Sequence, residues 1–380
     1  MNEPVYLDYN ATAPLRPEAL AAMTKALEAT GNASSPHAFG RRARRIVEDA
    51  REAVAALVGA RPQQVVFTSG GTEANTLALR GCARSRVLVS AGEHASVLQA
   101  PVEAVRLPLR RDGLVSLAKL ASLLAAETGP AIVSLQLANN ETGVIQPVAE
   151  AAALAREFGA VVHCDAVQAV GKIPVDFALL GVDLMSLSAH KLGGPQGIGA
   201  LIVADDVALQ PLLRGGGQER GRRAGTENVA AIAGFGAAAA AAGELSYLAV
   251  RRDAFEAELR ALAPSVVIFG AAAQRLPNTT CLALPGLTAE RQLMALDLAG
   301  VAVSSGSACS SGKVAPSHVL AAMGASPEET QAALRVSTGW ASGAADYARF
   351  LEAWRPLMQT KGAQTSGSSA PALPESTVTA

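Results

Sequence analysis

Short apolar runs alternate with segments of helical periodicity through the first two thirds of the chain. Strands built from apolar residues throughout, alternating with helices, are typical of a mostly parallel sheet that is covered on both faces. The pattern therefore predicts an α/β fold. The predicted strands are 64–68, 87–89, 131–137, 161–164, 182–188 and 200–203, and the predicted helices include 17–28, 40–58 and 147–158.

The last third of the chain has a different pattern. A long alanine-rich helical region, 228–262, precedes short strands and helices that are typical of a smaller α+β unit. From about residue 361 the chain lacks apolar periodicity, and this pattern predicts a disordered tail. We expect an N-terminal segment (1–15) that joins the small domain, a large cofactor-binding domain (16–250), a small C-terminal domain (251–358) and a disordered tail (359–380).

Charge and composition exclude several classes of protein. The 380 residues include 32 lysines and arginines against 33 acidic residues, so no global field attracts nucleic acid or a membrane. The most apolar run, 229–243, is shorter than the ~20 residues of a membrane helix. The start of the chain does not have the pattern of a signal peptide. The four cysteines are far apart and lack zinc-ligand spacing, so we expect a soluble, cytoplasmic protein with reduced thiols and no metal site.

Polar clusters follow several of the predicted strands, and in an open parallel sheet such clusters meet at one edge. Lys191 follows the strand at 182–188. A desolvated lysine favours its neutral amine, which forms Schiff bases. Alone, a lysine after a strand is more often an ordinary surface residue. The segment 69–72 (SGGT) between a strand and a helix suits a phosphate cradle, although taken alone it is better explained by a plain glycine turn with a threonine N-cap.

Four further residues complete a recognisable set at this edge. His94 can stack on a flat ring and carry protons, and Asp165 at a strand end needs a positive or protonated partner. Gln168 lies one turn after Asp165, and Asn140 lies in a loop where an Asx turn is the simpler interpretation. Together with Lys191 and a phosphate cradle that Ser188 and His190 extend, these are the groups that pyridoxal phosphate requires.

The chain resembles the cysteine desulfurases, which are pyridoxal-phosphate enzymes of the class V aminotransferase family and fold type I. The resemblance covers about Tyr6 to Trp340. It implies a seven-stranded-type, mostly parallel sheet. The matching motifs are YLDYNATAP, SSPHAFGRRAR, TSGGTEANTLAL, EHASVL, NNETGVIQP, HCDAVQAVGK, SAHKLGGPQGIGALIV, GGGQERGRRAGTEN and SSGSACSS.

The resemblance assigns a role to each residue of the set. It implies that Lys191 holds the cofactor, that Asp165 pairs with the pyridine nitrogen and that His94 stacks on the ring. Gln168 would reach the phenolic oxygen, and Asn140 would contact cofactor or substrate. The phosphate-binding residues that it implies are Gly71, Thr72, Ser188 and His190.

Three more residues take their interpretation from the same family. Thr226 is similar to a threonine that family members lend to the phosphate across a homodimer interface. Arg335 lies where the family has an arginine that binds the substrate carboxylate, and bidentate geometry favours arginine there. Relatives usually continue the Arg335 motif with Gly-Arg, whereas this chain has Gly339-Trp340, a change that affects how the substrate end is built.

One cysteine identifies the reaction among those that pyridoxal phosphate serves. Cys309 lies among small, turn-forming residues, where a thiolate can meet another sulfur. Its segment, SSGSACSSGKVAPSHVL, resembles the longer cysteine-bearing loop of the nitrogen-fixation and housekeeping iron–sulfur enzymes. The other three cysteines lie in apolar runs and are interpreted as small buried hydrophobic residues, namely Cys82, Cys164 and Cys281.

The expected reaction is removal of sulfur from L-cysteine. Lys191 would remove the α-proton, Cys309 would take the sulfur as a persulfide, and His94 would donate or accept a proton near that sulfur. The persulfide would pass to an iron–sulfur scaffold or another sulfur-acceptor protein, with Cys309 touching a cluster only transiently. A selenocysteine lyase or another class V lyase is the alternative; a non-catalytic, partner-binding paralogue is disfavoured because Lys191 and Cys309 are present. Arginines cluster at 41–45 and 220–223. Nucleic-acid binding there is disfavoured, because the chain has no excess of basic residues and lacks stacking aromatics.

Overall fold

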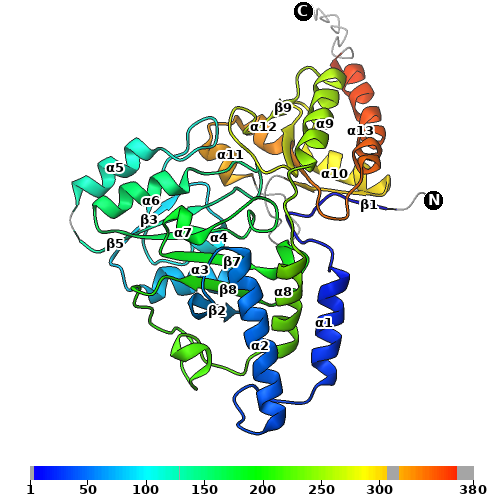
Figure 1. Ribbon diagram of the computed structural model, residues 1–380. Helices are drawn as coiled ribbons and strands as arrows, with labels where there is room; N and C mark the ends of the chain where they lie inside the picture. Colours follow the sequence, from blue (N-terminus) through cyan, green and yellow to red (C-terminus); the bar gives the residue numbers. More distant parts are fainter. Residues whose placement is uncertain (1–3, 128, 306–315, 366–380) are drawn as a thin grey trace, which may run out of the picture.

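A seven-stranded sheet forms the centre of the larger part of the computed structural model, which describes residues 4–127, 129–305 and 316–365, with side chains up to residue 358 (Figure 1). The strand order is β2-β8-β7-β6-β5-β3-β4, and only β8 runs antiparallel to the rest. The predicted α/β fold is therefore confirmed. The strands are β2 (Val65–Thr68), β3 (Arg86–Ser90), β4 (Val105–Leu107), β5 (Ala131–Gln136), β6 (Val161–Asp165), β7 (Leu184–Ser188) and β8 (Gly199–Val203).

Helices cover both faces of this sheet, which is why its strands are apolar at consecutive positions. On β2, Val65 and Phe67 pack into one hydrophobic core while Val66 packs into the other. The first core includes α2 (Ala38–Leu57), α5 (Leu117–Ala126), α6 (Val148–Glu157), α7 (Phe177–Leu180) and α8 (Val229–Ala241). The second includes α3 (Gly71–Gly81) and α4 (Ala95–Leu98), and α1 (Pro17–Glu28) packs on α8.

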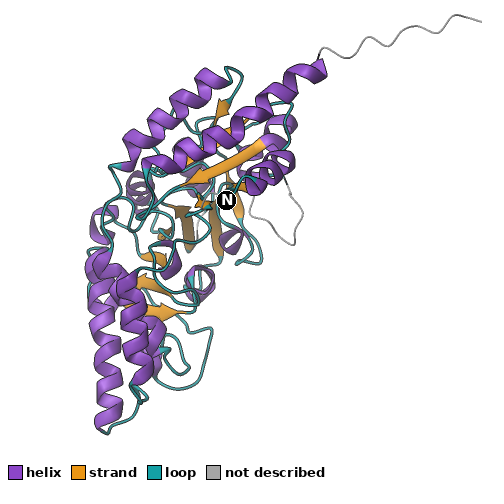
Figure 2. Ribbon diagram, turned by 90° about the vertical axis from the view of Figure 1, so that its right-hand side faces the viewer, coloured by secondary structure: helices purple, strands orange, loops and turns teal. Residues whose placement is uncertain are grey.

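A smaller antiparallel sheet organises the C-terminal part of the chain. Its order is β12-β13-β10-β9, from β9 (Val267–Ile268), β10 (Thr279–Ala283), β12 (Ser304–Ser305) and β13 (Ala333–Ser337). One core joins it to α9 (Leu248–Leu262), α10 (Ala289–Leu298) and α13 (Ala344–Thr365), and another joins it to α11 (His318–Ala322) and α12 (Pro327–Ala332). Figure 2 shows this part above the large sheet.

The N-terminal strand belongs with this smaller part. β1 (Val5–Tyr6) pairs in parallel with β11 (Val301–Ala302), and Leu7 packs into the small-domain core. The chain then crosses to the large sheet. It crosses directly beside Lys191. Residues 10–13 hydrogen-bond to the 3₁₀ turn η2 (Ala189–Lys191), where Ala13 N donates to His190 O and Lys191 Nζ donates to Asn10 O.

The structure differs from the sequence prediction at three places. The helical region 228–262 is two helices, α8 and α9, and they pack in different cores. β13 was not predicted, because its residues are buried on both faces and follow a helical pattern without a break. Helix α13 continues to Thr365, past the expected domain end at 358, and residues 366–380 lie outside the described part. Within the described residues, no helix is long and apolar enough to cross a membrane.

Candidate active site

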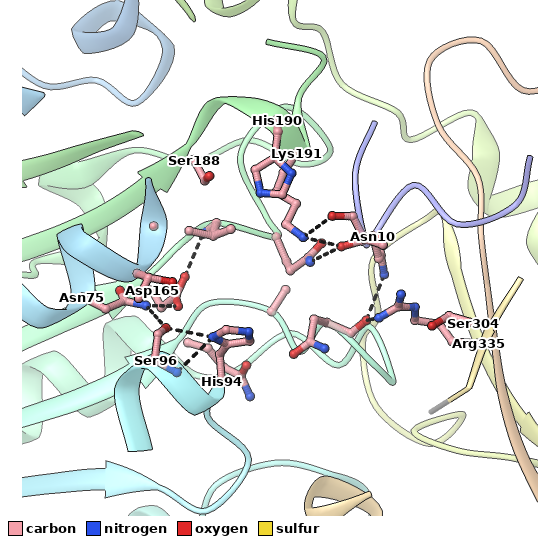
Figure 3. A pocket seen from close by; sticks show the side chains of 18 of the residues that line it. Asn10, Asn75, His94, Ser96, Asp165, Ser188, His190, Lys191, Ser304 and Arg335 are labelled. Atoms are coloured by element: carbon pink, nitrogen blue, oxygen red, sulfur yellow. Dashed lines mark hydrogen bonds between the residues drawn. The ribbon is translucent and has the colours of Figure 1, made fainter. Parts of the chain in front are cut away.

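A cavity of about 460 Å³ opens at the carboxyl edge of the large sheet, where it meets the small domain (Figure 3). It brings together residues that are far apart in the sequence. Among the described residues, all of the predicted cofactor and substrate residues except Thr226 line it. They are Gly71, Thr72, His94, Asn140, Asp165, Gln168, Ser188, His190, Lys191 and Arg335.

Lys191 reaches the cavity from the turn that follows β7. Its Nζ donates to the carbonyl oxygens of Asn10 at 2.6 Å and Ala11 at 2.7 Å. Burial, together with repulsion from Arg335, lowers the pKa of Lys191 to about 8. The amine is therefore close to the range in which it acts as a nucleophile or a base at physiological pH.

The loop after Lys191 is held by the N-terminal segment. Gly193 has φ +90°, and a Cβ there would lie 2.6 Å from the Arg16 side chain, so glycine is required. Arg16 Nε donates to Leu192 O at 2.9 Å, and the Arg16 guanidinium lies 5.0 Å from the ring centre of Trp340. Trp340 also donates to Pro14 O at 3.2 Å. Trp340, at which the chain departs from the family pattern, therefore supports the loop that follows Lys191 through Arg16.

Asp165 is buried at the end of β6 and accepts only neutral donors. Its Oδ2 accepts from Asn75 Nδ2 at 2.8 Å, and its Oδ1 accepts from Val167 N at 3.0 Å. It forms no ion pair with any residue that the structure describes. A buried carboxylate without a cation favours a protonated, positively charged partner in the cavity.

His94 projects into the cavity from the position before α4. Its Nδ1 accepts from Ser96 N at 3.1 Å and lies 2.8 Å from Ser96 Oγ. Desolvation by the surrounding protein lowers the pKa of His94, repulsion from Lys191 and His318 adds to this, and Asp165 opposes it. The ring is therefore neutral at physiological pH.

The N-terminus of α3 forms one end of the cavity. No side chain caps this helix, so its first N–H groups are available to an anion. Gly71 allows close packing here, because a Cβ would lie 3.0 Å from Val167 and 3.5 Å from Ser188. His190 Nδ1 lies 3.2 Å from Thr12 Oγ1, and burial lowers the pKa of His190 to about 4. This end adjoins a second hollow that shares Gly71, Thr72, Ser188 and His190.

A buried lysine orients two amide side chains beside Lys191. Lys172 is 3% exposed, and its Nζ donates to Asn10 Oδ1 at 2.8 Å and Gln168 Oε1 at 2.7 Å. The Gln168 amide nitrogen therefore points away from Lys172 and donates to Asn10 O at 2.9 Å. Burial, with repulsion from Lys191 and Arg335, sets the pKa of Lys172 well below its usual value.

Arg335 enters the cavity from β13 on the side of the small domain. Its Nη2 forms an ion pair with Asp8 Oδ1 at 2.6 Å, and its Nη1 donates to Asn140 O at 3.2 Å. Its Nε is buried without a hydrogen-bond partner. A guanidinium with an unused buried donor that faces a cavity suits a carboxylate ligand.

One predicted site residue of the described part, Thr226, does not line this cavity. Thr226 is exposed and lines a separate cavity of about 200 Å³, in a segment that Glu219 holds through a bidentate ion pair with Arg51. Cys309 lies outside the described residues. The described residues on either side of 306–315 are close to the cavity, because Ser304 lines it and His318 Nε2 lies 2.9 Å from Glu93 O.

Several site residues were missed by sequence reasoning. Asn75, Ser96 and Lys172 lie within the matching motifs, one helical turn or less from residues that were singled out. That spacing is the signal that identifies them. Asp8 and Asn10 lie in the opening YLDYNATAP, which also resembles the family, but only the fold shows that this segment reaches Lys191 and Arg335.

A mostly parallel sheet whose carboxyl edge holds a cavity with a lysine of lowered pKa and a buried carboxylate is typical of an enzyme. The model for the aminotransferase class-V family matches residues 5–350, and the chain belongs to this family.

Similar proteins span nearly the whole chain. It is 43% identical over 373 residues to a cysteine desulfurase of Cereibacter sphaeroides, covering 94% of this chain and 96% of the relative. The X-ray structure of a NifS-like protein from Rickettsia africae has a TM-score of 0.87 at 34% identity, covering 94% of this chain and all of that one. A structure of SspA in complex with cysteine has a TM-score of 0.78 at 30% identity, covering 88% of this chain and 98% of that one.

Proposed function

We propose that this protein is a cysteine desulfurase that uses pyridoxal phosphate. The observation that carries the proposal is the single cavity, because it joins Lys191 and Asp165 to Arg335. A relative that covers nearly the whole chain is named for this activity, and a structural neighbour was solved with cysteine.

The residues present fit pyridoxal phosphate at three points. The uncapped N-terminus of α3 suits the phosphate, with donors from Thr72 and Ser188. The buried Asp165, which forms no ion pair among the described residues, suits the protonated pyridine nitrogen. Lys191, with its lowered pKa, suits the covalent attachment. His94 would lie against the ring and Gln168 near its phenolic oxygen.

When bound, pyridoxal phosphate would supply an electron sink for the bonds around the α-carbon of the substrate. Lys191 would hold and move the α-proton, since its pKa of about 8 allows either protonation state. Arg335 would bind the α-carboxylate, and Asn140 would lie beside it. These two side chains would fix the carboxylate end of the substrate in the cavity.

Cys309 would accept the sulfur. The overall conversion is L-cysteine plus the Cys309 thiol giving L-alanine plus a Cys309 persulfide, in which a sulfur–sulfur bond forms and the carbon–sulfur bond breaks. The three cysteines in the described part are buried, and burial raises the pKa of each thiol. They are therefore unsuited to this role.

Two partners belong to the proposal. A second copy of the chain would place its Thr226 at the phosphate end, where the adjoining hollow exposes Gly71 and Thr72. A sulfur-acceptor protein, such as an iron–sulfur scaffold, would receive the persulfide sulfur from Cys309. The 33 acidic and 32 basic residues give no field that favours a nucleic acid.

Turnover of L-cysteine tests the proposal. The purified protein should release L-alanine and, with a reducing thiol, sulfide. Cys309→Ser should bind the cofactor normally yet lose alanine release, whereas Cys82→Ala should keep it because that buried thiol lies outside the cavity. Full alanine release by Cys309→Ser would assign the sulfur to another acceptor. Equal assays with L-selenocysteine and cysteine sulfinate separate this activity from the other class V lyases.

A further inference from the structure

A chain of hydrogen bonds runs from Asp165 to His94 (Figure 3). Asn75 Nδ2 donates to Asp165 Oδ2 at 2.8 Å and to Ser96 Oγ at 2.9 Å. Ser96 Oγ lies 2.8 Å from His94 Nδ1, and Ser96 N donates to the same nitrogen at 3.1 Å. Asn75 is 1% exposed, so this chain is shielded from solvent at its centre.

The direction of each bond follows from the chemistry of its end groups. An ionised carboxylate only accepts, so Asp165 fixes the Asn75 amide with its nitrogen toward both acceptors. Consistent with this, Asn75 Oδ1 is buried without a hydrogen-bond partner. Ser96 Oγ therefore accepts from Asn75, and its own hydrogen is free to be donated to His94 Nδ1. The backbone N–H of Ser96 cannot reverse its direction.

We propose that Ser96, oriented by Asn75, holds His94 as the tautomer with its proton on Nε2, so that the ring presents an N–H donor to the cavity. Both donors of Ser96 point at Nδ1, which must then carry a lone pair. A neutral imidazole with one acceptor nitrogen has its hydrogen on the other. Ser96 is thus a positioning residue that acts through His94.

This tautomer restricts what His94 does during catalysis, and this part of the inference rests on the proposed function. Nε2 has no lone pair for a substrate proton, and a proton on Nδ1 would oppose the N–H of Ser96. His94 therefore stabilises an anionic sulfur by hydrogen bonding, and the proton transfers belong to Lys191. The titratable groups that act on the ring are Asp165, Lys191 and His318; Asp165 raises the pKa of His94 and the other two lower it.

Nitrogen NMR of the histidine rings decides the tautomer directly. The full-length protein with its cofactor is labelled with ¹⁵N-histidine, and His94→Gln assigns one of the five ring systems. At neutral pH the wild type should give a pyridine-type Nδ1 and a pyrrole-type Nε2 for His94. A pyrrole-type Nδ1, or two protonated nitrogens, overturns the proposal.

The role of Ser96 is tested by a matched pair of variants. Ser96→Ala should raise the ratio of Nδ1–H to Nε2–H tautomer about five-fold, the size of one neutral hydrogen bond. Ser96→Thr keeps the hydroxyl and should give the wild-type spectrum. Identical spectra for Ser96→Ala and wild type would overturn the role of the hydroxyl. The spectra do not depend on turnover, so absent L-cysteine activity with the predicted tautomer would reject the proposed function alone.

Discussion

The two walls of the cavity are built in different ways. The large-domain wall, which is formed by Asn75, His94, Asp165 and Lys191, is held by bonds to residues of the large domain and of the N-terminal segment. The small-domain wall is formed by Ser304, whose strand pairs with β13, and by Arg335, which reaches the large domain through the Asn140 carbonyl. Arg335 bonds to Asp8 and to the Asn140 carbonyl.

The same contrast holds where the chain resumes after residue 315. Ser317 Oγ donates to Glu141 Oε2, and His318 bonds to the Glu93 carbonyl, so both partners belong to the large domain. Burial raises the pKa of Glu141 to about 7, which makes this bond sensitive to pH. Asp165 and His94 are therefore held within the large domain, whereas substrate binding by Arg335 depends on how the small domain sits against the large one.

Loss of Lys191 should have the largest effect, because it removes the reactive group of the large-domain wall. Lys191→Ala should lower desulfuration on the order of 10⁴-fold or more. It should also remove the visible absorbance of the lysine-bound cofactor. The matched control is Lys119→Ala, an exposed change on α5, which should leave both unchanged. A retained visible band in Lys191→Ala would place the attachment elsewhere.

Loss of Lys172 should weaken the support of that wall while leaving its reactive group in place. Lys172→Met leaves the buried Gln168 Oε1 without its donor and Asn10 Oδ1 with only Asn278 Nδ2, and about 1–3 kcal/mol of unfolding free energy should be lost.

The pH dependence of this loss has a defined sign. The folded pKa of Lys172 is lowered, so the unfolded chain binds the extra proton below about pH 10. The unfolding free energy of the wild type minus that of Lys172→Met should therefore increase as pH rises. Urea unfolding at several pH values measures the difference, and a gap that narrows with rising pH would contradict a buried amine with a lowered pKa.

Arg335 couples the two walls electrostatically, and Arg335→Gln measures that coupling. The neutral Lys191 amine is the nucleophile, so cofactor rebinding to the apoprotein should speed up as pH rises through about 8 in wild type. Arg335→Gln removes a like charge and should move this midpoint to higher pH. An unchanged midpoint would show that the walls are electrically independent. The variant should also raise KM for L-cysteine.

Trp340→Arg should have the smallest effect. It restores the residue usual in the family and replaces a favourable ring contact with a like charge beside Arg16. The free energy of unfolding should fall by about 0.5–1 kcal/mol, which a thermal melt measures as a lower melting temperature. Because Trp340 supports the loop after Lys191, kcat should change more than KM. A change in KM alone would instead place Trp340 at the substrate end.

Sequence reasoning located the large-domain wall well. Lys191, Asp165 and His94 each follow a strand that is apolar at consecutive positions, and the strand ends of a parallel sheet meet at one edge. The family resemblance then supplied their roles, together with Arg335. Taken alone, the position of Lys191 after a strand favours an ordinary surface lysine.

Contacts across long stretches of sequence were not predictable in the same way. Asn10 contacts Lys172 and Lys191, more than 160 positions away, and nothing in its local sequence indicates this. β13 was missed because burial on both faces removes the alternation that reveals a strand. The donor and acceptor of each hydrogen bond at Ser96 could not be predicted from the sequence, because they depend on which atoms face one another in the fold.

Peptide mass mapping after one turnover tests the central claim most directly. The wild-type protein is mixed with one equivalent of L-cysteine without reductant, alkylated and digested. The account predicts the added mass of one sulfur atom on the peptide that contains Cys309, matched by one equivalent of L-alanine. Added sulfur on the peptides of Cys82, Cys164 or Cys281, or L-alanine release with no persulfide on any cysteine, would contradict it.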